Sequence, residues 1–379
     1  MNRLALKMLF GDRAKYFMLI SGIVLATMLM SHGGAIFCGI MASFAPSLYN
    51  IRAKIWVTYP AVECINDVMP MRDTDVGLVR SVDGVSWAVP LYHGQTSIKA
   101  STGKIVDVRL VGIDSSTLIG APDTMVEGDV HDILSPNSII ISEYSVKQLG
   151  KMIGRPVRVG DRLEMNNVDA VVSGICHVHE SGLGFPFVYT SYSSAMHYIP
   201  QKNRTLMYIL VGVQDGRDVS EVAREIETRT GLKAFTETEF LASTFKWYVV
   251  NTALPMNVAL IVLMGFLVGT AVSGQTFYSF IWENMGNFAA MKAMGMKTRR
   301  LCAMLILQSL IVGLVGFGIG QGVVAVLGYV MVRMGSSPFL LLWQVSALTG
   351  VAVLLICMVS AVIGITKISK IEPAVVFRS

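Results

Sequence analysis

Four long apolar runs constrain this chain more than any other feature. They cover about residues 16–42, 251–282, 301–332 and 345–366, and each is nearly free of charged side chains. A helix needs about 20 apolar residues to cross the hydrocarbon core of a bilayer. Four runs of this length exceed what a soluble core of this size needs, so the sequence predicts four membrane-spanning helices, one followed by three.

The segment 43–250 between the first and second runs has the composition of an ordinary water-exposed domain. Short runs rich in Val and Ile alternate there with helical patterns, without strict strand–helix alternation, which favours an α+β domain. The expected strands are Ile55–Tyr59, Val85–Tyr92, Val106–Ile113, Ser138–Ser142, Pro156–Met165, Val168–Val178 and Met207–Val213. The expected helices are Asp73–Ser81, Ser142–Met152 and Arg217–Thr230.

Both ends of this domain are expected to join the membrane helices directly. The first helix is predicted to continue to about Tyr49, and its apolar run is too long for a cleaved signal peptide. The segment Thr238–Asn251 has helical composition and is predicted to run straight into the second span, with Pro255 kinking the join. The fold class is therefore an α+β membrane protein whose large extracytoplasmic domain is inserted between helices one and two.

Basic residues in short segments set the expected orientation. Residues 1–15, 283–300 and 367–379 hold eleven basic residues and three acidic ones, whereas Arg333 is the only charge in the link 333–344. Short loops rich in Lys and Arg stay in the cytoplasm. We therefore expect an inner-membrane protein with both termini and the 283–300 loop in the cytoplasm. The amphipathic segment 1–15 is expected to lie on the inner leaflet.

The distribution of charge along the chain does not indicate nucleic-acid binding. The overall +5 comes from the cytoplasmic segments, because the inserted domain holds 19 basic and 23 acidic residues. A phosphate loop is also absent: Gly103-Lys104 is the nearest fragment, but Ile98 stands where the first glycine belongs. If ATP drives this protein, another chain binds it. We expect no cofactor in this chain.

Candidate metal and catalytic groups are sparse. His177 and His179 alternate on one predicted strand next to Glu180, but zinc sites have at least three protein ligands in most proteins. We expect a surface pair of histidines, with a metal site as the alternative. Cys64 and Cys176 could form a disulfide outside the membrane, although their separation in sequence says little about proximity. Without a catalytic set, we expect no enzymatic activity.

His32 is the one strongly ionisable side chain deep in a membrane run, and Met28 lies one turn before it. Intramembrane ionisable residues are functional candidates by default. The pair could contact haem or a polar group of a substrate. Alternatively, His32 could simply form a hydrogen bond to a neighbouring helix.

Glycines spaced by four recur in two spans. Gly265 and Gly269 lie in the second, and Gly316 and Gly320 lie in the third, where Gly318 and Gly322 repeat the spacing. Such spacing lets helix backbones approach closely. We expect these glycines to pack helices within the chain or across a dimer.

The cytoplasmic segment after the second span is the most informative. Phe288, Met291 and Met294 recur at every third residue and predict an apolar ridge on a short helix. Gly295 then favours a helix end. An exposed apolar ridge suggests a docking surface for another protein, whereas an interfacial helix lying on lipid is the alternative.

The layout of one helix, a large outer domain and three helices resembles the MacB/FtsX-type permeases of ABC transporters. The match sharpens between Val268 and Gly295, where residues 274–278 read GQTFY, Glu283 follows, and 291–295 read MKAMG. These stretches resemble the "GQ-x-x-Y … LKA-x-G" pattern of DevC-type permeases. The tail 373–378 reads PAVVFR and resembles the P-A-x-x-x-R ending of the same family.

The resemblance implies a homodimer in which each protomer engages a separate ATPase, which binds ATP and Mg. The ATPase contact would lie in the loop between the second and third helices. The implied coupling residues are Phe288, Met291, Lys292, Ala293, Met294 and Gly295. The outer domains would move as levers, a mechanotransmission. A periplasmic adaptor and an outer-membrane channel would complete export of a lipid, glycolipid or other amphiphile.

The sequence departs from this pattern at Gly286 and Asn287, where many relatives carry an Arg-Glu pair. A charged contact to the ATPase is therefore in doubt. Two other functions stay open beside export. One is an FtsX-like signalling module that activates a periplasmic partner, although a typical FtsX has a smaller outer domain. The other is a haem exporter that uses His32.

Overall fold

The computed structural model describes residues 13–99, 103–179, 185–201, 204–334 and 338–369. The chain divides into two compact units. The inserted domain comprises Met41–Thr252, and the membrane unit comprises the residues up to Ile40 and from Ala253 onward. The predicted segment 1–15 and the PAVVFR tail lie outside the described residues, apart from Arg13–Lys15 at the start of the first helix.

The inserted domain is built on ten strands of one sheet among the described residues. The order along the sheet is β10-β1-β9-β2-β3-β8-β5-β7-β4, and β6 pairs with β2 and β7. The bounds are β1 Ile55–Thr58, β2 Val85–Lys99, β3 Ile105–Ile113, β4 Thr124–Glu127, β5 Ser138–Ser142, β6 Arg162–Met165, β7 Val168–His177, β8 Phe187–Ser191, β9 Tyr208–Val213 and β10 Lys233–Thr236.

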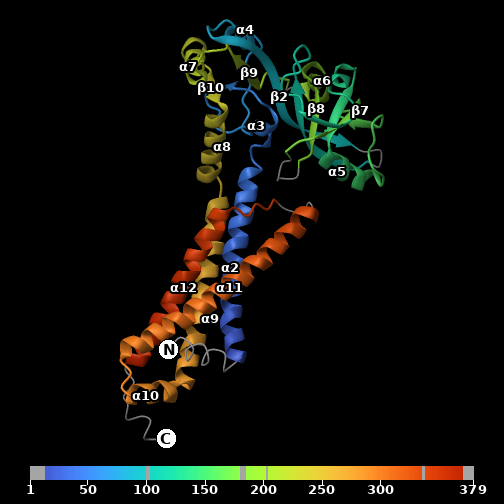
Figure 1. Ribbon diagram of the computed structural model, residues 1–379. Helices are drawn as coiled ribbons and strands as arrows, with labels where there is room; N and C mark the ends of the chain where they lie inside the picture. The colour runs from blue at the N-terminus through green and yellow to red at the C-terminus, as the bar shows by residue number, and fades with distance from the viewer. Residues whose placement is uncertain (1–12, 100–102, 180–184, 202–203, 335–337, 370–379) are drawn as a thin grey trace. The chain divides into compact units, whose positions relative to one another are not determined.

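The long strand β2 joins the two halves of this sheet (Figure 1). Its first half pairs antiparallel with β9 from Val85 to Leu91, and its second half pairs with β3 from Tyr92 to Lys99. The sequence predicted only the first half of this strand. It also missed the short strands β4, β8 and β10, and the strand expected from Pro156 begins only at Arg162.

Helices cover the sheet, and several of them begin with a side-chain cap. They are α3 Pro46–Asn50, α4 Asp75–Arg80, η1 Val130–Leu134, α5 Glu143–Ile153, α6 Tyr192–Tyr198, α7 Val219–Thr230 and α8 Glu237–Asn251. The Thr236 hydroxyl accepts from the Glu239 amide at the start of α8, and the Glu239 carboxylate accepts from the Thr236 amide. This reciprocal box satisfies two amides that the helix itself cannot.

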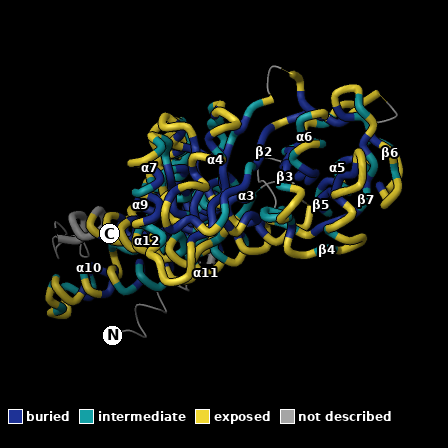
Figure 2. Tube along the Cα trace, turned by 90° about the horizontal axis from the view of Figure 1, so that it is seen from above, coloured by how far each residue is buried: buried dark blue, intermediate teal, exposed yellow. Residues whose placement is uncertain are grey.

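Large aromatic side chains fill the core of the inserted domain. Trp56, Tyr208 and Phe240 are fully buried, and their ring centroids lie 5.7–6.1 Å apart. Figure 2 shows buried residues concentrated along the strands, with exposed ones on turns and outer helix faces. Cys64 and Cys176 are both described and buried, and no disulfide joins them.

The membrane unit contains four helices long and apolar enough to cross a bilayer within the described part of the chain. The predicted arrangement of one helix, then an α+β domain, then three helices is confirmed. The helices are α2 Arg13–Ala42, α9 Leu254–Glu283, α11 Thr298–Met334 and α12 Trp343–Ser369, with the short helix α10 Met285–Ala293 between α9 and α11.

Two expected continuous helices are interrupted. α2 ends at Ala42 and not near Tyr49, because Pro46 has no amide to donate and instead starts α3. α8 ends at Asn251, and Thr252 is extended with φ −119° and ψ 156°. Pro255 lies in the first turn of α9, where a proline is tolerated because the amide that it lacks would have no hydrogen-bond partner within that helix. The predicted kink at Pro255 is therefore wrong.

Candidate functional site

The loop 283–300 folds into a defined helix–turn connection. The side chain of Asn284 donates to the Phe280 carbonyl at 2.9 Å and closes the end of α9. After α10, Gly295 adopts φ +89°, a left-handed conformation that favours glycine. The Met296 amide donates to the Met291 carbonyl, and the Gly295 amide donates to Lys292. This bond pair is a Schellman motif, so the predicted helix end at Gly295 is confirmed.

The predicted apolar ridge points inward at two of its three positions. Phe288 is fully buried and Met291 is 5% exposed. Both pack in one cluster with the end of α9 and the start of α11, whose members include Phe280, Ile281, Leu301, Met304 and Leu305. The expectation that Phe288 and Met291 form an exposed docking ridge is therefore wrong.

Met294 is the exposed member of the ridge, with 79% of its surface accessible. Around it, Ala293 and Gly295 are exposed and Lys292 is half-buried. The neighbouring basic residues Lys297, Arg299 and Arg300 are exposed. We call Met294 and these three basic residues the loop face. It combines one large apolar side chain with positive charge next to the hydrogen-bonded turn that ends α10.

An aromatic pair lies at the end of α9 beside this loop. The rings of Tyr278 and Trp282 stack with centroids 6.5 Å apart, and Trp282 is 56% exposed. Together with Ser279 and Glu283 they line a shallow hollow of about 220 Å³. Exposed Tyr and Trp at the end of a span are typical of a membrane–water interface.

The four predicted packing glycines all contact α2 of the same chain. A Cβ added to Gly269 would lie 2.5 Å from the Ala26 Cβ, and one added to Gly316 would lie 2.8 Å from the Ile23 Cβ. Gly265 and Gly320 approach Met30 and Thr27 in the same way. These glycines therefore pack helices within one chain. By contrast, a Cβ on Gly318 or Gly322 would have no described neighbour within 4 Å.

His32 lies half-buried on α2, with its ring centroid 5.9 Å from that of Phe339. Its Nδ1 has no hydrogen-bond partner among the described residues. Met28 is half-buried one turn earlier. The structure brings an aromatic ring to His32, and the helix-to-helix hydrogen bond expected for it is not formed by Nδ1.

The adjacent Ser31 makes the polar contact that was expected of His32. Its hydroxyl donates to Thr349 Oγ1 at 3.0 Å and accepts from Gln321 Nε2 at 2.8 Å. This junction links α2, α11 and α12 inside the bundle. This junction could not be recognised from the sequence, because single Ser, Thr and Gln residues are common in apolar runs. Only the folded structure brings these three side chains together.

The inserted domain contains a buried Ser–His pair. Ser47 Oγ lies 2.6 Å from His93 Nε2, and both residues are at most 3% exposed. Burial, together with the nearby Arg109 guanidinium, holds the pKa of His93 well below its usual value. A neutral and buried imidazole fastens α3 to β2. His177 lies on the surface instead, with Nδ1 2.7 Å from a Glu143 carboxylate oxygen, and Glu180 lies outside the described residues.

Comparison with known proteins assigns both parts of the chain. Residues 16–229 match the family model of the MacB-like periplasmic core domain, which is more than half of the chain. Residues 250–373 match that of the FtsX-like permease C-terminal domain. The chain belongs to the MacB/FtsX-type ABC transporter permeases. The family assignment makes this chain a membrane permease component of an ABC transporter.

Two solved structures are similar to the inserted domain of this MacB/FtsX-type permease. The extracellular domain of the noncanonic ABC-type transporter YknZ from Gram-positive bacteria is 16% identical; the match covers 49% of this chain and 100% of that one, with a TM-score of 0.35. The periplasmic region of MacB from Actinobacillus actinomycetemcomitans is 13% identical, with 55% and 98% covered and a TM-score of 0.37. With TM-scores this low, the family assignment rests on the two family models alone.

Proposed function

We propose that this chain is the permease subunit of an ABC exporter in the inner membrane, with both termini and the 283–300 loop in the cytoplasm. A separate ATPase binds ATP and Mg and docks on the loop face. Its hydrolysis cycle is transmitted to the inserted domain, which moves on the periplasmic side. The exporter acts as a homodimer with a periplasmic adaptor and an outer-membrane channel, and moves a lipid, glycolipid or other amphiphile.

One observation supports the docking site above others: Met294 is 79% exposed at the end of a helix whose two largest apolar neighbours in the predicted ridge, Phe288 and Met291, are buried. Phe288 and Met291 hold α10 against α9 and α11, so a push on Met294 would reach both spans without bending a loose loop. Burying a methionine side chain contributes about 1.5–3 kcal/mol. That is enough to make Met294 a main anchor of a protein interface.

The coupling residues divide into two roles in this proposal. Met294 and the flanking basic residues touch the ATPase. Phe288 and Met291 act as positioning residues that transmit force into the bundle. Gly286 and Asn287, exposed at the start of α10, replace the Arg-Glu pair of relatives, and the basic residues Lys297, Arg299 and Arg300 supply charge in its place.

ATPase stimulation tests the proposal. The full chain in nanodiscs is mixed with its candidate ATPase, and Met294→Glu is compared with the original protein. Because the new carboxylate would be desolvated in the interface, we expect ATPase affinity to fall about tenfold or more. Stimulation of hydrolysis should fall in parallel.

Two matched variants separate docking from folding. Met294→Leu keeps an apolar side chain and should keep stimulation near the original level. Leu134→Glu adds the same charge to a residue that is 49% exposed in the inserted domain, and should leave ATPase binding unchanged. If the original protein neither binds nor stimulates the ATPase, or if Met294→Glu behaves like the original, the docking site is elsewhere and the proposal fails.

A further inference from the structure

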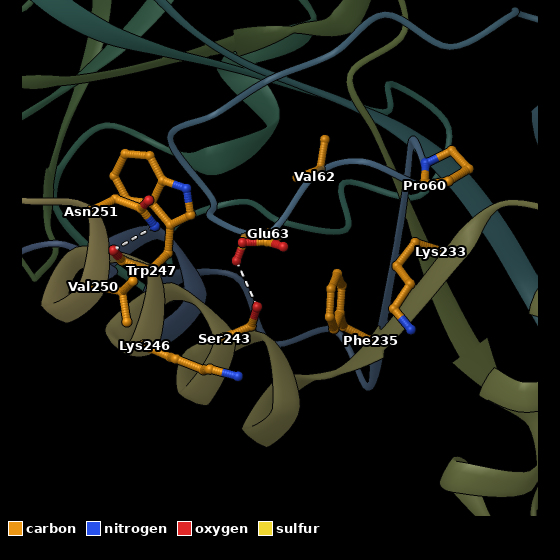
Figure 3. A pocket seen from close by; sticks show the side chains of 10 residues that line it. All are labelled: Pro60, Val62, Glu63, Lys233, Phe235, Ser243, Lys246, Trp247, Val250 and Asn251. Carbon is orange, nitrogen blue, oxygen red and sulfur yellow. Dashed lines mark hydrogen bonds between the residues drawn. The ribbon is translucent and has the colours of Figure 1, made fainter.

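The inserted domain contains a hollow of about 370 Å³ whose walls come from three segments. The residues after β1 form one wall, β10 forms the second, and α8 forms the third (Figure 3). The Ser243 hydroxyl of α8 donates to the Glu63 carbonyl at 2.7 Å, and the Ile65 amide donates to Thr244 Oγ1. These bonds hold two walls together, so the hollow is formed before any ligand arrives.

The charged side chains around the hollow are not equivalent. The Lys233 ammonium group already has partners within the domain. Its Nζ lies 2.6 Å from Glu227 Oε1 and over the Phe235 ring. Glu63 and Lys246 are exposed, and neither side chain forms an ion pair or hydrogen bond with another described residue. The hollow therefore offers one carboxylate and one ammonium group that are both available to a ligand.

The rest of the lining is largely apolar and continues along α8. Val62 is buried in the wall opposite α8, and Trp247 and Val250 lie on α8 itself, with Val250 70% exposed. In the sequence, only Thr252 and Ala253 separate the last lining residue, Asn251, from the first residue of a membrane span. Tryptophan is enriched where proteins meet the lipid headgroup layer.

Size and charge together narrow the class of ligand. The volume lies at the lower end of the range of about 300–1,000 Å³ found for small-molecule pockets, which is small for a helix or strand of a partner protein. A purely anionic ligand would meet the Glu63 carboxylate, and a purely apolar one would leave both charges without partners. A molecule with a phosphate and an ammonium group beside an acyl chain satisfies every wall.

We infer that this hollow binds a zwitterionic phospholipid. Its phosphate lies against Lys246, its ammonium group against Glu63, and the start of an acyl chain along Trp247 and Val250. As a substrate-recognition site the hollow rests on the export function proposed above, although lipid binding itself does not require that function.

Photolabelling of the full chain tests this site directly. The protein is purified in detergent and exposed to short-chain phosphatidylethanolamine or phosphatidylglycerol, each with a diazirine in its acyl chain, and labelled peptides are quantified. We expect phosphatidylethanolamine to label residues 243–251 about tenfold more than phosphatidylglycerol at equal concentration. Lys246→Glu should reduce that labelling by about tenfold. Glu63→Lys should reverse the preference, because both free charges of the hollow would then be positive.

Control variants carry the same charge changes elsewhere. Lys104→Glu and Glu127→Lys alter exposed residues of β-strands or turns outside the hollow, and their labelling should match the original. Soluble phosphoethanolamine, which lacks acyl chains, should compete poorly. Competition equal to that of the short-chain lipid would show that the ligand is a free zwitterion and would overturn the lipid assignment.

Three other results would overturn the inference. These are equal labelling by both lipids in the original protein, no change in preference for Glu63→Lys, and labelling of the membrane helices without residues 243–251. No ATPase is present in this assay, so its failure leaves the docking of the ATPase at Met294 untouched, and the failure of docking leaves lipid binding untouched.

Discussion

The inserted domain packs around large aromatic side chains, whereas the membrane helices pack through glycine. Trp56, Tyr208 and Phe240 fill the centre of the domain, while Gly269 and Gly316 bring α9 and α11 against α2. Water drives the burial of large apolar surfaces in the first case. In lipid that driving force between helices is absent, so close backbone approach and van der Waals contact decide the packing.

The difference teaches which substitutions each region tolerates. In the domain, removing atoms leaves a cavity. In the membrane unit, adding atoms between helices forces them apart. The most damaging substitutions therefore run in opposite directions, from large to small in one region and from small to large in the other.

The largest expected effect is at Trp56. Trp56→Ala removes a fully buried ring that packs on Tyr208 and Phe240, and should lower the unfolding free energy of the inserted domain by about 3–5 kcal/mol. Pulse proteolysis of the full chain in urea measures this. Trp343→Ala in the membrane unit removes a ring that is 75% exposed, and should change stability by less than about 0.5 kcal/mol. Equal effects would break the comparison.

Next in size is a single added methyl group between membrane helices. Gly269→Ala would place a Cβ 2.5 Å from that of Ala26, whereas Gly318→Ala meets no described atom within 4 Å. We expect the first to destabilise the bundle by about 1–3 kcal/mol and the second to be neutral or slightly stabilising. Thermal unfolding in detergent separates them. A neutral Gly269→Ala would mean that α2 and α9 can move apart freely.

A smaller effect depends on pH and belongs to the inserted domain alone. The folded-state pKa of His93 is lowered, chiefly by burial, so the unfolded chain binds the proton first as pH falls. The contribution of His93 to stability is therefore fully present well above the unfolded-state pKa of about 6.5, and the unfolding free energy should fall by on the order of 1 kcal/mol between pH 7.5 and pH 5.5. Pulse proteolysis at both pH values measures it.

The matched variant is His93→Gln. Its unfolding free energy should be lower than that of the original protein at pH 7.5. It should fall less between pH 7.5 and pH 5.5, because the variant lacks the imidazole. The glycine contacts contain no titratable group, so the penalty of Gly269→Ala should be the same at pH 5.5 and pH 7.5. A pH slope that persists in His93→Gln would assign the effect to another group.

The candidate docking site shows which features the spacing of apolar residues can predict and which it cannot. The spacing of Phe288, Met291 and Met294 correctly located a short apolar helix, and Gly295 correctly marked its end. Periodicity could not say that α9 and α11 of the same chain would cover Phe288 and Met291. An apolar stripe on a helix indicates that another surface covers it, but the stripe does not identify that surface. The coupling role of the segment stays a prediction.

Several features followed from the sequence by itself because their physical causes are local. The number and order of the spans depend on apolar length, and the helix end at Gly295 depends on a residue that accepts positive φ. The α+β class of the inserted domain followed from short β-prone runs between helical patterns. The motif resemblance led to the family that the two family models then assigned.

Other features were decided only by the tertiary structure. They include the partner of each glycine, the buried side of α10, the meeting of Ser31 with Gln321 and Thr349, and the hollow between α8 and β10. Most of them join residues far apart in the chain, such as Glu63 and Lys246. Local propensity acts over a few residues, whereas packing depends on which distant surfaces come together, and a single sequence does not record that.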